Sequence, residues 1–294
     1  MFGLFSRHWR GAIGVWVGLA FSLILPVAMF FVMIYSQAYL ELDRGPYARM
    51  AGATGGAIFS TLAAIWLLVG NWRTASKSIS PRRWFVTRWL SRIVALAGAA
   101  ATCLPWLYIA PQAVTNMQAI LKDQDYVGQK PAYTLDVNGD ELAVTGWVTW
   151  SLQDALVKAL DDNPGVRTLV LNGPGGNAAV GLRMSNLIRS RQLDTMTTRF
   201  CASSCTIMFA GGHRRLIQKG ARLAYHELFA TFKTTSGGWN PMIDLLESRY
   251  RDVWRAEGVP SDFIDHVFRT PSDQVWTPAA EELLAANVVT DVVD

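Results

Sequence analysis

The stretch Thr168-Leu-Val-Leu-Asn-Gly-Pro-Gly-Gly-Asn177 joins a short apolar run to a glycine-rich turn. A fully apolar run of this length is typical of a strand that is buried on both faces, as in a parallel sheet. Residues 179–190, which follow the turn, are predicted to form a helix. A strand, a turn and a helix in this order predict an α/β domain when further strands and helices alternate around them.

The flanking segments repeat this alternation. An Asn138-Gly139-Asp140 turn predicts a first hairpin from residues 135–137 and 142–148, and Ser151–Leu160 has one apolar helical face. The remaining elements are predicted as strands at 195–200, 214–217 and 222–226, a helix start at 203–210, and helices at 241–257 and 278–286. The domain they form, about 170 residues long, is large enough to bury a substantial core.

The N-terminal part of the chain is strongly apolar. Hydrophobic residues make up 51% of the 294 residues and charged residues 17%, against about 25% charged in soluble proteins. This composition excludes an all-soluble, disordered or collagen-like protein, and three cysteines are too few for a disulfide scaffold. Three runs without a charged residue, each long enough to cross about 30 Å of hydrocarbon, lie at Gly11–Leu40, Met50–Trp72 and Ile93–Leu121.

These runs predict three transmembrane helices, at about 11–36, 50–72 and 93–114. We expect a membrane anchor over residues 1–115, a linker over 116–134 and a globular domain over 135–294. The first run is too long for the apolar part of a cleaved signal peptide, and two further spans follow it. No ionisable residue lies within the spans, which favours an anchor over a transporter or an intramembrane protease.

Charge predicts the orientation of the anchor. Residues 1–111 carry ten Lys or Arg and two acids, whereas residues 112–294 carry an excess of four acids. The basic residues concentrate before the first span and between the second and third, which places the N-terminus in the cytoplasm and the globular domain outside it. In a bacterium this is a multi-pass protein of the inner membrane with a periplasmic or extracellular domain. The acidic domain argues against nucleic-acid binding.

Residues 71–92 also mix arginine with Trp84, Phe85 and Trp89. This composition fits a loop that lies on an anionic lipid leaflet. It fits equally a plain topology signal, which is the simpler interpretation.

Three local features could carry chemistry. Bare amides in the turn at 172–177 could hold an oxyanion or a phosphate, although the phosphate-loop patterns are absent and a plain loop is the alternative. In Cys201-Ala-Ser-Ser-Cys205, a serine at a helix start is either an activated nucleophile or an ordinary helix cap. His226 ends a short strand, where a lone histidine is more often structural than catalytic.

The order of these features is more specific than any one of them. Gly175, Ser203 and His226 follow one another at intervals of 28 and 23 residues. This arrangement resembles the ClpP-like peptidases of the crotonase-like fold, over some 160 residues from about Leu135, and most closely their membrane-tethered or periplasmic branch. The segment 276–291 is similar to the family's final helix and strand, with Asn287 where the family usually has glycine. The resemblance implies a spiral of ββα units, a homo-oligomer, a peptide or unfolded-protein substrate, and no cofactor or metal.

Site roles follow from this resemblance residue by residue. Ser203 matches the nucleophile, with Ser204 as the alternative, and His226 matches the general base. Gly175, Gly176 and the amide of Ser204 match the oxyanion hole. The family's aspartate would fall near Arg269 or Thr270, so Asp273 is our choice, with Asp265 on the other side. A Ser–His dyad is the alternative, and a Ser–Lys site using Lys219 or Lys233 has no motif to support it.

Cys201 and Cys205 bracket the proposed nucleophile. An oxidising compartment permits a disulfide, but helical spacing would hold their Cβ atoms about 5–6 Å apart, more than the ~3.8 Å that a disulfide prefers. A disulfide and two buried thiols are both compatible with the sequence, and zinc is disfavoured because no histidine lies at ligand spacing.

The leading hypothesis is a membrane-anchored extracytoplasmic serine peptidase. An inactive scaffold of the same fold is the second, and acyl-CoA chemistry is a distant third.

Overall fold

The computed structural model describes residues 2–40, 45–77, 85–121, 133–229 and 241–294. The chain divides into two compact units, Met1–Met117 and Gln118–Asp294, and each is considered by itself.

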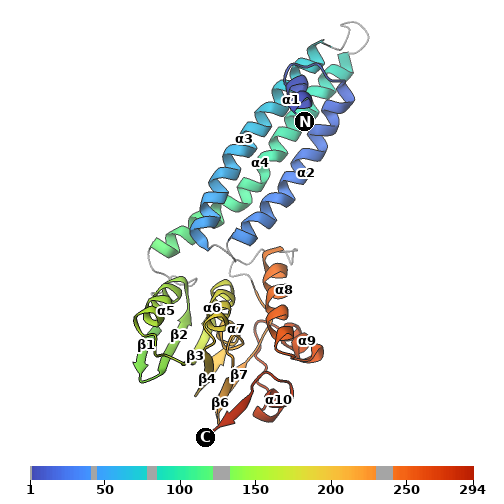
Figure 1. The fold of residues 1–294 in the computed structure, drawn as a ribbon. Helices are drawn as coiled ribbons and strands as arrows, with labels where there is room; N and C mark the ends of the chain where they lie inside the picture. Colours follow the sequence, from blue (N-terminus) through green and yellow to red (C-terminus); the bar gives the residue numbers. More distant parts are fainter. Residues whose placement is uncertain (1, 41–44, 78–84, 122–132, 230–240) are drawn as a thin grey trace. The chain divides into compact units, whose positions relative to one another are not determined.

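In its described residues, the only regular elements of the first unit are helices (Figure 1). A short helix precedes three long ones, and the three long helices are apolar and long enough to cross a membrane. They extend beyond the predicted spans at most ends, because polar and interfacial residues continue each helix past its apolar run. The four helices are α1 (Phe2–Trp9), α2 (Val15–Tyr39), α3 (Pro46–Lys77) and α4 (Phe85–Leu121).

Small residues allow the long helices to pack closely. A side chain at Gly98 of α4 would meet the carbonyl oxygen of Ser22 in α2 at 2.6 Å. The Asn71 amide of α3 donates to the Ser22 hydroxyl at 2.8 Å. Small residues and interhelical hydrogen bonds are the usual means of helix association in a bilayer, where lipid removes the hydrophobic drive.

The second unit is a mixed α/β domain. Its β1–β2 hairpin is antiparallel and every other strand pairing is parallel. The strand order of the main sheet is β1-β2-β3-β4-β6-β8. Its elements are β1 (Tyr133–Asn138), β2 (Glu141–Val148), α5 (Trp150–Asp162), β3 (Thr168–Gly176), α6 (Ala178–Ser190), β4 (Asp194–Thr197), β5 (Phe200–Ala202), α7 (Ser204–Phe209), β6 (Arg215–Gln218), β7 (Arg222–Ala224), α8 (Pro241–Ala256), α9 (Ser261–Arg269), α10 (Ala280–Ala285) and β8 (Asp291–Val293).

Strand β3 belongs to two sheets. Its first half, Thr168–Val170, pairs with β4 in the main sheet. Its second half pairs with β5 through Gly173, and β5 pairs in turn with β7. The single strand predicted at 195–200 is therefore wrong, because the chain leaves the main sheet after Thr197 and enters the smaller sheet at Phe200.

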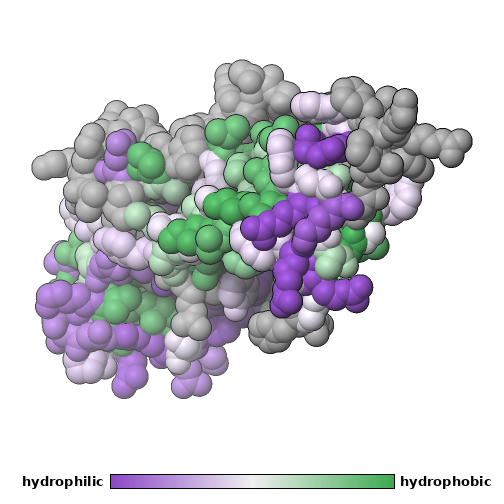
Figure 2. Space-filling view, turned by 90° about the horizontal axis from the view of Figure 1, so that it is seen from above, coloured by the Kyte–Doolittle hydropathy of each residue, from purple (hydrophilic) through white to green (hydrophobic). Residues whose placement is uncertain are grey.

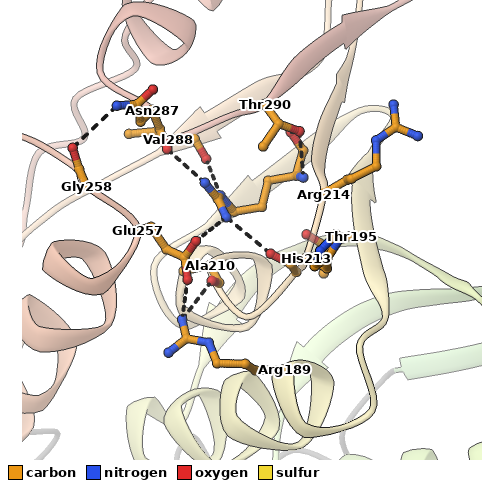
Figure 3. A network of polar contacts seen from close by, with 12 residues as sticks. Arg189, Thr195, Ala210, His213, Arg214, Glu257, Gly258, Asn287, Val288 and Thr290 are labelled. Carbon is orange, nitrogen blue, oxygen red and sulfur yellow. Dashed lines mark hydrogen bonds and ion pairs between the residues drawn. The ribbon is translucent and has the colours of Figure 1, made fainter.

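In the second unit, a buried polar network joins the C-terminal segment to strand β6 (Figure 3). The Arg215 guanidinium donates to the carbonyl oxygens of Asn287 and Val288, both at 3.1 Å, and forms an ion pair with Glu257. Asn287 has φ of +56°. Asparagine tolerates this left-handed conformation better than most residues.

Candidate active site

The three proposed catalytic elements leave the same edge of the smaller sheet. Strands β3, β5 and β7 are neighbours and parallel, with Gly173 opposite Cys201 and Ala202 opposite Ala224. Carboxyl ends of parallel strands lie at one edge, which is where such sheets place their ligand sites. The predicted turn at 172–177 is wrong for its glycines, because β3 continues through Gly176 and pairs Gly175 and Gly176 with Trp147 and Val148 of β2. Gly175 therefore lies in the last residues of β3, Ser203 follows β5 directly, and His226 lies two residues after the end of β7.

Ser203 occupies a sharp turn between β5 and α7. Its φ is +53° and its ψ is −125°, a region that costs a non-glycine residue of order 1–3 kcal/mol and that is concentrated at functional sites. Its side chain makes no helix-capping hydrogen bond. The ordinary cap interpretation therefore does not describe this serine, which sits on a strand–turn–helix elbow like those that expose nucleophiles.

The neighbouring Ser204 has a different environment. Its side chain is 0% exposed, and its hydroxyl has no hydrogen-bond partner in the described part of the chain. Ser203, in contrast, is half-buried. As the first residue of α7, Ser204 also carries a main-chain N–H that no carbonyl within the helix can reach.

Gly175 lies directly against Ser203. Its φ is +102°, and a Cβ atom at this position would come within 2.7 Å of the Ser203 Cβ and 3.1 Å of the Ser204 nitrogen. Gly176 also has a positive φ, and a Cβ there would collide with the Val148 carbonyl oxygen. Both positions need glycine, and Gly175 brings its backbone beside the amide of Ser204.

His226 is oriented by a main-chain group. Its Nδ1 atom lies 2.7 Å from the carbonyl oxygen of Glu227. A carbonyl oxygen only accepts hydrogen bonds, so this contact assigns the proton of the neutral ring to Nδ1 and leaves the Nε2 lone pair free. The Glu227 N–H donates to the Thr270 carbonyl at 2.8 Å, and its carboxylate accepts from the Ser272 N–H at 3.2 Å.

The candidate third residues are not joined to His226. Asp273 is exposed, and among the described residues no hydrogen bond or ion pair links it to His226. Asp265 binds the Arg251 guanidinium at 2.6 Å. Lys219 precedes β7, so it lies at the opposite end of that strand from His226, and Lys233 lies outside the described residues.

Cys201 and Cys205 are joined by a disulfide, with their Cα atoms 5.3 Å apart. Cys201 belongs to β5 and Cys205 to α7, so only one of the two is helical and the helical spacing does not apply. The disulfide closes a five-residue ring that contains Ser203. In the described part of the chain no group of three His, Cys, Asp or Glu side chains is placed to hold a metal ion.

The role of Asn172, which positions the backbone at residues 198–199, was not predicted from the sequence. Its side chain is 8% exposed, and its Oδ1 atom accepts from the N–H groups of Arg199 at 2.9 Å and Thr198 at 3.3 Å. It thereby fixes the bend through which the chain passes from β4 to β5. The signal in the sequence that could have predicted this role is a polar asparagine that directly follows a buried apolar run.

No protein family and no curated protein matches this chain. Among solved structures, a ClpP1 mutant from Listeria monocytogenes is similar with a TM-score of 0.45 and 15% sequence identity, covering 53% of this chain and 92% of that chain.

Proposed function

We propose that this protein is a membrane-anchored serine peptidase with an extracytoplasmic catalytic domain. The observation that carries the proposal is the convergence of Gly175, the positive-φ Ser203 and His226 on the ends of three adjacent parallel strands. A glycine turn, a serine on an elbow and a histidine with a free Nε2 are the parts that acyl transfer needs.

The mechanism uses each part once. His226 Nε2 takes the proton of the Ser203 hydroxyl, and the Ser203 oxygen attacks the peptide carbonyl carbon. The amides of Ser204 and the glycine turn hold the developing oxyanion, each contributing about 3 kcal/mol to lowering the barrier. Protonated His226 then protonates the leaving amine, and water hydrolyses the acyl-enzyme by the same steps. The Glu227 carbonyl keeps the imidazole in the reactive tautomer.

The location of this chemistry rests on the first unit. Three candidate spans, with the basic residues before the first and between the second and third, support a second unit on the opposite side of the membrane from the N-terminus, by the positive-inside rule. Peptides or unfolded segments that reach the bacterial periplasm or cell exterior are the proposed substrates. A homo-oligomer is part of the proposal by resemblance alone.

A covalent serine probe tests the proposal. Purified full-length protein in detergent is treated with a fluorophosphonate, and the labelled residue is identified by peptide mass spectrometry. Labelling at Ser203 that is lost in Ser203→Ala, kept in Ser204→Ala and at least about 100-fold slower in His226→Ala is the expected result. Labelling that persists in Ser203→Ala but not in Ser204→Ala would move the nucleophile to the buried serine.

An inactive scaffold of the same fold is the second candidate. The observation that favours it is that, among the described side chains, no hydrogen bond joins the Ser203 hydroxyl to His226. Such contacts often tighten only when substrate binds. A folded wild-type protein that takes no label, with or without reductant, would support the scaffold and exclude the peptidase.

A further inference from the structure

One end of the first unit is a cluster of cations and tryptophans, which we call the basic end. It is formed where the last residue of α1, the end of α3 and the start of α4 meet. The Arg73 guanidinium donates to the Trp9 carbonyl at 2.9 Å, and Lys77 donates to the Arg10 carbonyl at 2.8 Å. Arg92 of α4 reaches the Ser76 hydroxyl at 3.4 Å. The members of the basic end are Trp9, Arg10, Trp72, Arg73, Lys77, Trp89 and Arg92.

The described residues of the first unit offer the basic end no counter-ion. Residues 2–40, 45–77 and 85–117 contain no Asp or Glu. The second unit is different, because several of its cations pair with carboxylates, among them Lys158 with Asp162 and Arg191 with Asp161, both at 2.6 Å. No described residue of the first unit therefore neutralises the positive charge of the basic end.

The donors of the basic end are only partly used. Arg73 and Lys77 each give one N–H to a neutral carbonyl oxygen. A guanidinium has five donors and an ammonium three, and both side chains are exposed. The exposed side chains of Arg73 and Lys77 can therefore donate further hydrogen bonds to a molecule outside the helices. Phosphate oxygens bind such charged donors well.

Exposed tryptophans indicate where this surface lies. Trp9 is 40% exposed, Trp72 48% and Trp89 47%, and the Arg92 guanidinium stacks 4.1 Å from the Trp72 ring centroid. Tryptophan beside arginine at the end of an apolar helix is typical of the headgroup level of a bilayer. Figure 2, which looks down on this part of the molecule, shows hydrophilic side chains grouped beside hydrophobic ones.

We propose that the basic end binds the phosphate headgroup of an anionic phospholipid. The lipid supplies the missing negative charge, and its acyl chains run along the apolar faces of the helices that end there. Two observations favour this occupant: its negative charge complements the basic end, and the tryptophans are typical of the level at which lipid headgroups lie. Free phosphate would satisfy the donors but gains nothing from the tryptophans or the adjoining apolar helix faces.

Native mass spectrometry of the full-length protein in detergent tests this proposal. The protein is titrated with phosphatidylglycerol or with phosphatidylcholine of the same chain length, and the dissociation constants are compared. We expect phosphatidylglycerol to bind at least about tenfold more tightly, because each basic residue near an anionic headgroup strengthens binding roughly fivefold. The triple variant Arg73→Gln/Lys77→Gln/Arg92→Gln should lose this preference.

Two controls keep the result interpretable. The triple variant Lys158→Gln/Arg191→Gln/Arg255→Gln removes the same charge from residues that have acidic partners, and it should retain the preference. Arg73→Lys/Arg92→Lys keeps the charge and should retain most of the binding, which guards against a folding defect in the first triple variant.

Three outcomes would overturn the proposal. The two lipids could bind equally to the wild type, or the control triple variant could lose the preference as well. In the third, an excess of inorganic phosphate displaces phosphatidylglycerol completely, which would identify a phosphate site instead of a lipid site.

Discussion

The main-chain N–H of Ser203 donates a 3.0 Å hydrogen bond to the carbonyl oxygen of Ala224. This bond extends the ladder between β5 and β7 by one residue beyond their paired ends. It fixes the backbone of the proposed nucleophile to the strand that delivers His226, two residues further on. The backbones of the two segments that carry Ser203 and His226 are thus held side by side by sheet hydrogen bonds.

Gly175→Ala should strongly reduce the rate at which Ser203 is labelled by the serine probe, without unfolding the domain. Its Cβ would lie 2.7 Å from both the Ser203 Cβ and the Ala202 carbonyl oxygen, so the turn must move away from the serine. We expect the rate of probe labelling to fall about 100-fold or more, as when an oxyanion donor is lost. Stopped-time labelling followed by gel fluorescence measures it.

Gly165→Ala is the matched control, because nothing lies within 4 Å of its Cβ position and its φ is not positive. Its labelling rate should equal that of the wild type. An active Gly175→Ala protein would show that the turn takes no part in the site.

Asp273→Asn distinguishes a carboxylate from a carbonyl as the group that orients His226. If the Glu227 carbonyl at 2.7 Å is sufficient, the labelling rate should change less than about threefold. Loss of the aspartate in a complete triad costs about 10⁴-fold. A decrease of that size would restore Asp273 to the site and would imply that the loop moves when substrate binds.

Removal of the Cys201–Cys205 disulfide should destabilise the elbow. A loop of five residues predicts a loss of about 2 kcal/mol on the chain-entropy account, and the strained φ of Ser203 loses its constraint. We expect Cys201→Ala/Cys205→Ala to unfold at a lower temperature in calorimetry and to label more slowly. Cys103→Ala, which removes the free cysteine of α4, should resemble the wild type in both measurements. An unfolding temperature and labelling rate of the wild type that do not change with reductant would contradict this prediction.

Arg215→Met should destabilise the second unit far more than Arg214→Gln. Arg215 is 4% exposed and neutralises the partly buried Glu257, whereas Arg214 pairs with Asp291 at an exposed surface. Breaking a buried pair costs about 3–5 kcal/mol, and an exposed pair is worth about 0–1 kcal/mol. Urea unfolding of both variants measures the difference, and similar midpoints would show that the network of Figure 3 is dispensable.

Two buried tyrosines predict a loss of stability in alkali. Burial raises the pKa of Tyr250 to about 12 and that of Tyr225 well above its usual value of 10.0. Above pH 10 the unfolded chain releases these protons and the folded chain keeps them, so the unfolding free energy falls as pH rises from 10 towards 12. Each tyrosine contributes about 1.4 kcal/mol per pH unit.

Tyr225→Phe checks this assignment. The Tyr225 hydroxyl is buried without a hydrogen-bond partner in the described residues, so its removal should leave stability at pH 7 unchanged or improved. The alkaline slope should be about half that of the wild type in urea unfolding at pH 8 to 11. An unchanged slope would assign the alkaline transition to other groups.

The local features of this protein could be predicted from its sequence. Long uncharged runs predicted the three membrane-length helices, because only such runs avoid exposing charge to lipid. The apolar run before Asn172 predicted β3, although the strand continues to Gly176 where a turn was expected, and the glycines predicted the positive φ of Gly175. Helix α9 was missed although its apolar residues Phe263, Ile264, Val267 and Phe268 recur with helical spacing, because a nine-residue helix gives a short signal.

The site itself depends on pairings between distant segments. The bend at which the chain leaves the main sheet and enters β5 is hydrogen-bonded by Asn172, which binds main-chain groups 26 and 27 residues away. The group that orients His226 is a main-chain carbonyl, and every residue has one. The sequence therefore determined which residues were chemically available, whereas only the tertiary structure decided which of them meet, because contacts made by the backbone leave no mark in the choice of side chains.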